Sequence, residues 1–191
     1  MKTLSVDELF RLFSKKEKRE AGEIAERKSK EPVVKIRELQ KSDRKKVLDL
    51  MNEFSDVFPP QYVNSRSFGG VLWFLNSARS GNIDQIGSFV LEVDGSVVGH
   101  ISYARDIRNF KDRAYELKSV VVGASYQKMG YGGLLVRYAL ERLKKTEAKF
   151  VYLITRKQTV IYFDKFGFDI IGLHEYFIDG NKKRYVLGKK L

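Results

Sequence analysis

The sequence predicts a mixed α/β domain that follows a short helical extension. Runs rich in β-branched residues alternate with segments whose apolar side chains recur at helical spacing. The pair Asp94-Gly95 separates two such runs and favours a tight turn, which predicts a hairpin. A β-branched run at 115–122 leads through a glycine-rich loop into a helical pattern at 130–145. These three observations together indicate strands and helices mixed along one chain.

Composition excludes several classes of protein. The 191 residues fit one domain with an extension, and 43% hydrophobic with 31% charged residues argues against global disorder. No cysteine is present, which rules out a disulfide framework, a thiol nucleophile and a cysteine-ligated metal. The only histidines, His100 and His174, make a multi-histidine metal site unexpected. The sequence has no apolar run of membrane-spanning length and no secretion signal, so we expect a cytoplasmic protein without a membrane partner.

The charge balance points to an anionic ligand. Lys and Arg number 36 against 24 Asp and Glu, a formal net charge of +12. A charge of this sign attracts nucleic acid, anionic lipid or a phosphate-rich cofactor. The sequence contains no aromatic-rich RNA-binding motif, so nucleic acid is not the partner we expect.

Residues 1–32 differ in composition from the rest of the chain. Ser5 and Glu8 have capping-box spacing, and Leu9, Leu12 and Phe13 share one helical face. The whole segment carries nine basic and seven acidic residues, too balanced for a polyanion-binding tail. We expect a helix docked on the domain or on a second subunit of a homodimer, followed by a charged linker.

The first half of the domain, from Val33, is expected to hold a strand, two helices and the hairpin. Strand 33–39 is followed by a helix at 42–54 with apolar residues at core spacing. Prolines and turn residues predict a loop at 56–68, and a second helix is expected at 71–79. The hairpin strands are 88–93 and 96–104.

The second half continues with two strand-helix pairs and a final hairpin. Gly167 is a stop signal for the shorter helix. The expected elements are a strand at 115–122, a helix at 130–145, a strand at 150–156, a helix at 160–166, and strands at 168–178 and 183–191 around a turn at 179–181.

The loop between the 115–122 strand and the next helix has the composition of an anion site. Gln127, Gly130, Gly132 and Gly133 allow close backbone approach and expose amide groups at a helix start. This arrangement suits a pyrophosphate, although a simple packed strand-to-helix turn is the alternative. The segment lacks the Lys-Ser/Thr of a P-loop and the glycine spacing of a dinucleotide fingerprint.

A family resemblance rests on this loop. Gln127-x-x-Gly130-x-Gly132, preceded by a β-branched strand, resembles the acetyl-CoA signature of the GCN5-related N-acetyltransferase (GNAT) family. The resemblance covers about residues 33–191. It also includes Ile36-Arg37-Glu38 as the opening strand and FVLEVDGSVVGHISY as the second and third strands. The segment YFDKFGF resembles the closing Tyr-x-x-x-Gly-Phe element, with its tyrosine one residue earlier.

The resemblance implies a mostly antiparallel sheet flanked by helices, with a splayed parallel pair of central strands at 117–122 and 150–156. It implies acetyl-CoA as co-substrate and no metal, with the pantetheine arm between these strands and the pyrophosphate on the loop amides. The cofactor-binding residues that it implies are Val120, Val121, Val122, Gln127, Lys128, Met129, Gly130, Tyr131, Gly132 and Gly133.

The tyrosine that often acts as general acid in this family is shifted by one residue in this chain. The family often places a tyrosine where Phe163 stands, whereas Tyr162 comes one residue earlier. One residue turns a helical side chain by about 100°, so Tyr162 is either a rotated acid or a packing residue. A thiolate with a pKa of about 8.5 is also a fair leaving group without a donor. Arg156, where the family often has asparagine, and Lys157 either meet CoA phosphates or are exposed.

A general base is needed because an alkyl amine has a pKa of about 10.4 and is mostly protonated at neutral pH. Glu116 lies eleven residues before Gln127, the position of the base in the histone-modifying branch of the family. Glu92 is the second candidate. His100 is expected to be a structural strand histidine, and His174 is not a candidate.

The function predicted is acetyl-CoA-dependent N-acetyl transfer by direct attack of an amine on the thioester. A backbone N–H of residues 120–122 would polarise the acetyl oxygen. The acceptor is a small amine or a peptide, bound by regions that the resemblance places at 55–80 and 172–185. The alternative is a non-catalytic CoA-binding module with a regulatory or partner-binding role, which Phe163 and the extension at 1–32 motivate.

Overall fold

The structure is a computed structural model that describes residues 31–54, 86–106, 113–176 and 182–191. Residues Val34–Leu191 form one compact unit, and Met1–Val33 are grouped apart from it. The helices expected at 5–13 and 71–79, the loop at 56–68 and the turn at 179–181 lie outside the described residues. The boundary at residue 32 stays a prediction.

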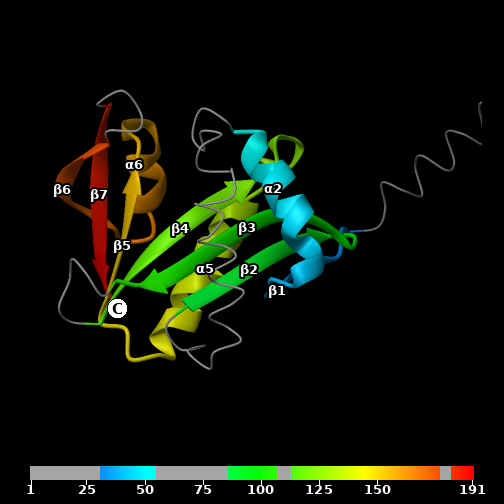
Figure 1. Cartoon of the computed structure of the whole chain (residues 1–191), viewed down its shortest axis with the longest axis horizontal. Coiled ribbons are helices and arrows are strands. Elements are labelled where there is room, and N and C mark those ends of the chain that lie inside the picture. Colours follow the sequence, from blue (N-terminus) through cyan, green and yellow to red (C-terminus); the bar gives the residue numbers. More distant parts are fainter. Residues whose placement is uncertain (1–30, 55–85, 107–112, 177–181) are drawn as a thin grey trace, which may run out of the picture. The chain divides into compact units, whose positions relative to one another are not determined.

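The compact unit is built on a seven-stranded sheet with the order β1-β2-β3-β4-β5-β7-β6 (Figure 1). All neighbouring strands are antiparallel except β4 and β5, which are parallel. The predicted mixed α/β class, with a mostly antiparallel sheet, is therefore confirmed. The strands are β1 Val34–Glu38, β2 Ile86–Val93, β3 Ser96–Arg105, β4 Ala114–Val122, β5 Phe150–Thr155, β6 Asp169–Tyr176 and β7 Lys182–Lys190.

The hairpin between β2 and β3 forms where the sequence predicts it. Asp94 and Gly95 both have positive φ, 49° and 78°, as a two-residue turn of this kind requires. Val93 pairs with Ser96 directly across the turn. The Asp-Gly pair therefore sets the register of β2 against β3 next to the turn, up to the shift between Leu91 and Glu92.

The two parallel strands separate soon after they meet. Pairing between β4 and β5 covers only Ala114–Glu116 against Phe150–Tyr152, although β4 continues to Val122 and β5 to Thr155. Figure 1 shows the two strands starting together and then diverging. This fork is the splay that the resemblance implies.

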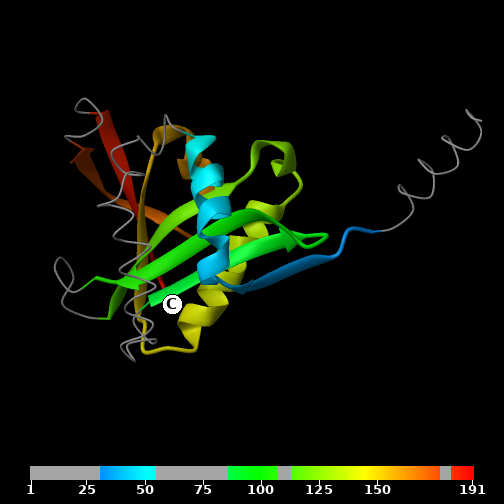
Figure 2. The ribbon, with the colours of Figure 1, turned by 45° about the vertical axis from the view of Figure 1, so that its right-hand side comes forward.

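Helices cover both faces of the sheet. The main core lies between the sheet and α5 Tyr131–Lys144, whose Leu135, Val136 and Ala139 are fully buried. A smaller core under α2 Arg44–Asn52 contains Val47, Met51 and Val90. Because side chains alternate along a strand, Val90 faces α2 while its neighbours on β2 face α5. Figure 2 shows α2 and α5 on opposite sides of the central strands.

Helix boundaries differ slightly from the prediction. The short helix α6 spans Lys157–Asp164 and begins three residues earlier than expected. The Thr159 hydroxyl donates to the carbonyl of Arg156 at 2.9 Å, which closes the first turn. Gly167, with φ of 78°, follows the helix as predicted. A 3₁₀ turn, η1 Lys41–Asp43, precedes α2.

The described residues contain neither a membrane-spanning helix nor a cluster of metal ligands. None of the described helices is long and apolar enough to cross a membrane. Within the same part of the chain, no three His, Asp or Glu side chains gather in a group that could hold a metal ion.

Candidate active site

The chain turns from β4 into α5 through a loop that its own contacts hold in place. A 3₁₀ turn, η3 Ala124–Tyr126, follows the strand, and the Gln127 side-chain amide donates back to the carbonyl of Val122 at 3.2 Å. The Gly123 N–H donates to the carbonyl of Val98 on β3 at 2.9 Å. The loop is thus fixed to the ends of two strands while its outer side faces solvent.

The start of α5 offers unpaired amide donors. Gly130 is the N-cap, with φ of 84°, and no side chain caps the helix. The first N–H groups of a helix have no acceptor within it, and the positive end of the macrodipole lies there. No acidic residue occupies the first turn, so no carboxylate of that turn repels an anion.

The predicted cofactor loop divides into an exposed part and a buried part. Gln127 through Gly130 are exposed, whereas Tyr131 and Gly133 are buried against the domain. Lys128 adopts a positive φ of 63°, so the backbone is left-handed at Lys128 as well as at Gly130. The structure therefore places Gln127 to Gly133 on one strand-loop-helix turn, as the sequence predicts.

A β-bulge shapes the end of β4. The register between β3 and β4 shifts between His100 and Ser102, and Ser119 on β4 has φ of 54°. Beyond the bulge, Val121 pairs with His100 and Val122 with Gly99. The ladder with β5 has already ended at this level, so β4 passes the fork with only β3 as its partner. No signal in the sequence indicates the left-handed serine.

Tyr162 lies close to the start of α5. A Cβ built on Gly132 would lie 2.7 Å from the Tyr162 hydroxyl oxygen, so this hydroxyl fills the space that glycine leaves. The hydroxyl is buried and has no hydrogen-bond partner among the described residues. Burial raises the pKa of Tyr162 above 10.0, while the charge of Arg137 opposes the shift. The group is therefore a protonated donor at neutral pH.

Phe163 has a different environment from its neighbour. It is 6% exposed and belongs to the main core, with its ring 6.0 Å from that of Phe168. Tyr162 instead packs its ring under the Lys165 ammonium, 4.2 Å from the ring centroid. The helix thus directs the tyrosine, not the phenylalanine, toward the predicted cofactor loop.

Glu116 stands on β4 at the last residue pair before the fork. It pairs with Tyr152 across the parallel ladder and with Ala104 on the other side. Since Tyr115 and Leu117 belong to the core under α5, Glu116 faces the opposite side of the sheet. Its carboxylate lies 2.8 Å from the ammonium of Lys118 and is 22% exposed. It is accessible and close to the fork.

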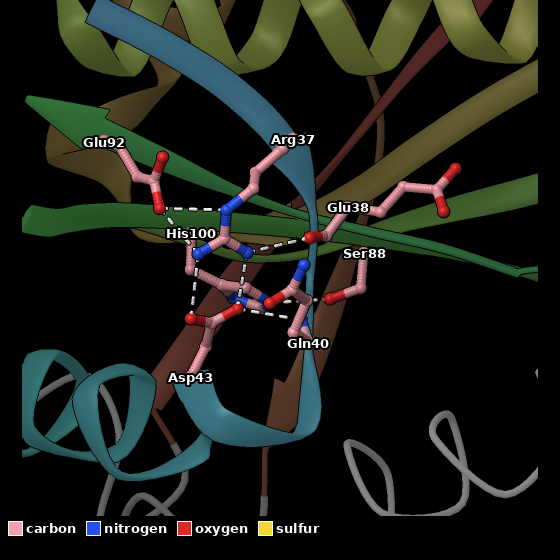
Figure 3. A network of polar contacts seen from close by, with 7 residues as sticks. All are labelled: Arg37, Glu38, Gln40, Asp43, Ser88, Glu92 and His100. Carbon is pink, nitrogen blue, oxygen red and sulfur yellow. Dashed lines mark hydrogen bonds and ion pairs between the residues drawn. The ribbon is translucent and has the colours of Figure 1, made fainter. Parts of the chain in front are cut away.

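Glu92, the second candidate base, belongs to a polar network on β1 and β2 (Figure 3). The Arg37 guanidinium contacts Glu92 at 2.6 Å and Asp43 at 2.6 Å. Asp43 also accepts the N–H of Gln40 at 2.8 Å. The hydrogen bond from Arg37 holds the pKa of Asp43 below its usual value. Glu92 is thus engaged in joining strands.

His100 is fully buried in the sheet. Its Nε2 lies 2.8 Å from the Ser88 hydroxyl, as Figure 3 shows. Burial lowers the pKa of His100 to about 4, so the ring is neutral at pH 7. This environment is that of the structural histidine expected from the sequence. The His174 side chain lies outside what the structure describes.

Sequence reasoning missed one residue of the site. The carboxylate of Glu53, at the end of α2, accepts the N–H of Ala124 at 2.9 Å. The two residues are 71 positions apart, and no motif connects them.

Comparison with known proteins adds independent evidence. The model of a family described as the acetyltransferase (GNAT) family matches residues 48–168. No curated protein matches the chain in sequence.

Three solved structures share the fold. A ribosomal-protein-alanine N-acetyltransferase from Brucella melitensis has a TM-score of 0.67 at 19% identity, covering 82% of this chain and 99% of its own. Arabidopsis thaliana Naa50, in complex with the bisubstrate analogue CoA-Ac-MVNAL, has a TM-score of 0.65 at 18% identity and covers 83% and 99%. A GNAT family acetyltransferase from Brucella melitensis, in complex with acetyl-CoA, has a TM-score of 0.57 at 21% identity and covers 83% and 88%.

Proposed function

Because the chain belongs to the acetyltransferase (GNAT) family, we propose that it transfers the acetyl group of acetyl-CoA directly to an amine. One observation carries the proposal: the amide-rich start of α5 lies at the end of β4, where β4 and β5 have separated. A fork beside an anion site suits a ligand that joins a diphosphate to a narrow thioester arm. Similar folds described with acetyl-CoA or a CoA analogue support this ligand.

The cofactor contacts follow from this placement. The peptide groups of Val120, Val121 and Val122 would bind the pantetheine arm and polarise the acetyl oxygen. The amides from Gln127 to Gly133 would bind the pyrophosphate at the positive end of the α5 dipole. Lys128 and Met129 lie on the exposed side of the same turn.

The protons of the reaction have two candidate carriers. The amine nitrogen attacks the thioester carbonyl, a C–N bond forms, the C–S bond breaks, and sulfur leaves as thiolate. Glu116 would accept the amine proton, since its carboxylate is accessible beside the fork. Tyr162 would supply a proton to the thiolate, because its hydroxyl is protonated and lacks a partner among the described residues.

The role of Glu116 is tested by Glu116→Gln in an acetyl-transfer assay with a panel of small amines and peptides. We expect kcat to fall by about 100-fold at pH 7, in the range of general base catalysis. The deficit should narrow as the pH rises toward about 10.4, because a growing share of the alkyl amine is then already unprotonated.

Glu141→Gln is the matched control, because the Glu141 carboxylate also lies beside a lysine ammonium, at 2.7 Å, but at an exposed position of α5. It should keep the wild-type rate at every pH. A Glu116→Gln profile that overlays the wild type excludes Glu116 as the base. A wild-type protein that binds CoA but acetylates no amine would support the non-catalytic alternative, which the phenylalanine at position 163 motivates.

A further inference from the structure

The cofactor loop begins with a residue that cannot cap its own turn. Gly123 is the N-cap of η3, and glycine has no side chain to accept the N–H groups that the turn leaves free. Glu53 supplies the missing acceptor, because its Oε2 receives the Ala124 N–H at 2.9 Å. A carboxylate from α2 thus performs the capping role that a local Ser or Asp usually performs.

Packing reinforces this hydrogen bond. A Cβ built on Gly123 would lie 3.1 Å from Cδ2 of Leu50 and 3.6 Å from Oε2 of Glu53. The last turn of α2 therefore rests directly on the residue where β4 ends and the loop begins. The Gly123 N–H donates to Val98 on the other side, so the start of the loop is held between α2 and β3.

A cavity of about 180 Å³ adjoins this contact. Lys46, Asp49 and Glu53 line it from α2, and Gly123 to Tyr126 line it from the loop. Of the two acidic residues there, only Glu53 has a hydrogen bond to the loop among the described contacts. The cavity leaves the loop room to move if that bond is lost.

We infer that Glu53 is a positioning residue that holds the start of the cofactor loop against α2 and so presets the amides downstream for the cofactor phosphates. The inference rests on the proposed function. Glu53 does not itself favour an anion, since its negative charge would repel a nearby phosphate. Its contribution to binding is therefore the order that it imposes on the loop, and an uncharged acceptor of the same length should serve as well.

Four variants separate this role from a merely structural one. Glu53→Ala removes the acceptor, and Glu53→Asp withdraws it by one methylene. Glu53→Gln keeps an acceptor oxygen at the same reach without the charge. Asp49→Ala removes a carboxylate from the same cavity that does not bind the loop, which makes it the control.

Hydrogen exchange of the CoA-free protein tests the tether without reference to function. Exchange in the segment 123–127 should be faster in Glu53→Ala and Glu53→Asp. It should be unchanged in Glu53→Gln and Asp49→Ala. Unchanged exchange in Glu53→Ala would overturn the inference even if the protein binds CoA.

Calorimetry with CoA and kinetics with acetyl-CoA test the consequence. Glu53→Ala should weaken CoA binding by about tenfold, the scale of one ordinary hydrogen bond. It should raise KM for acetyl-CoA by the same factor and leave kcat unchanged, while Glu53→Gln stays within twofold of wild type. Equal losses in Glu53→Gln and Glu53→Ala would overturn the inference. A wild-type protein that does not bind CoA would contradict the proposed function instead, and the exchange result would still decide the tether.

Discussion

At the scale of single residues, Gly132 and Tyr162 are complementary in volume. A methyl group at Gly132 would lie 2.7 Å from the tyrosine hydroxyl oxygen but 3.6 Å from the ring carbon that carries it. We expect Gly132→Ala to destabilise the domain by about 1–3 kcal/mol, the usual cost of overpacking. Tyr162→Phe removes the conflicting oxygen, so the double variant should recover most of this loss. Chemical denaturation of the four proteins in a double-mutant cycle gives the coupling energy.

The same cycle tests where the hydroxyl lies. If the two substitutions have additive effects on the free energy of unfolding, Tyr162 does not contact the start of α5. Tyr162 would then not lie beside the proposed cofactor loop, and it could not act as the proton donor.

His100 makes the stability of the domain sensitive to acid. Its pKa is about 4 in the folded protein, against an ordinary value of 6.5, because the ring is buried. Between these pH values the unfolded chain binds the extra proton and the folded chain does not. Stability therefore falls as the pH drops from 6.5 toward 4, by roughly 3 kcal/mol for this one group.

The measurement compares denaturation of wild type and His100→Gln across this pH range. The variant has no titrating ring but keeps a polar partner for Ser88. Wild type should lose roughly 3 kcal/mol more than the variant on acidification. If the free energy of unfolding changes with pH in the same way in both proteins, the pKa of His100 does not differ between the folded and unfolded states.

Some residue roles can be read from the sequence and others cannot. The order Tyr162-Phe163 shows that the family's tyrosine is displaced, but only packing shows which ring enters the core. No sequence motif points to the role of Glu53 or to the backbone conformation of Ser119. The role of Glu53 depends on a contact 71 positions away, and the left-handed backbone of Ser119 depends on a bulge formed with another strand.

At the scale of elements, Arg37 joins three of them. Its guanidinium on β1 contacts Glu92 on β2 and Asp43 at the end of η1, and their side chains are 8–20% exposed. Arg37→Lys keeps the charge but loses the fork that contacts both carboxylates. We expect a loss of about 1–2 kcal/mol in the free energy of unfolding.

Arg142→Lys is the control for this prediction. Arg142 contacts Glu38 through a single, exposed 3.5 Å approach. Its guanidinium also lies 5.8 Å from the centroid of the Phe89 ring, a contact that a lysine ammonium can make as well, so Arg142→Lys should cost less than about 0.5 kcal/mol. Equal losses in the two variants, measured by urea denaturation, would show that the Arg37 network adds nothing beyond a surface ion pair.

Most described elements agree with the sequence because local rules determine them. The β-branched runs form β2 to β5, and Asp94-Gly95 forms the turn. The start of α6 was predicted three residues late, since the hydrogen bond that closes its first turn involves a threonine, a poor helix former. A hydrogen bond between a side chain and a nearby carbonyl does not change the spacing of apolar residues, so the hydrophobic pattern does not reveal it.

At the scale of the whole molecule, the arrangement of strands is what sequence rules alone do not give. Antiparallel neighbours such as β2 and β3 follow from a short turn, but the parallel pairing of β4 with β5 connects distant segments. Only the family resemblance predicted that pair and its splay. The loop of Gln127 to Gly133 follows β4 beyond the point where its pairing with β5 ends.

Calorimetry with acetyl-CoA on wild type and two glycine variants tests the central claim, that this loop binds the cofactor. Gly130 and Gly95 have φ of 84° and 78°, and a Cβ on either would meet nothing within 4 Å. Gly130→Asp and Gly95→Asp therefore carry the same backbone cost and the same added charge, one in the loop and one in the β2–β3 turn. We predict that both lower the melting temperature alike, that Gly95→Asp binds acetyl-CoA as wild type does, and that Gly130→Asp does not bind it. Equal acetyl-CoA affinity in the two variants would contradict the assignment of the site.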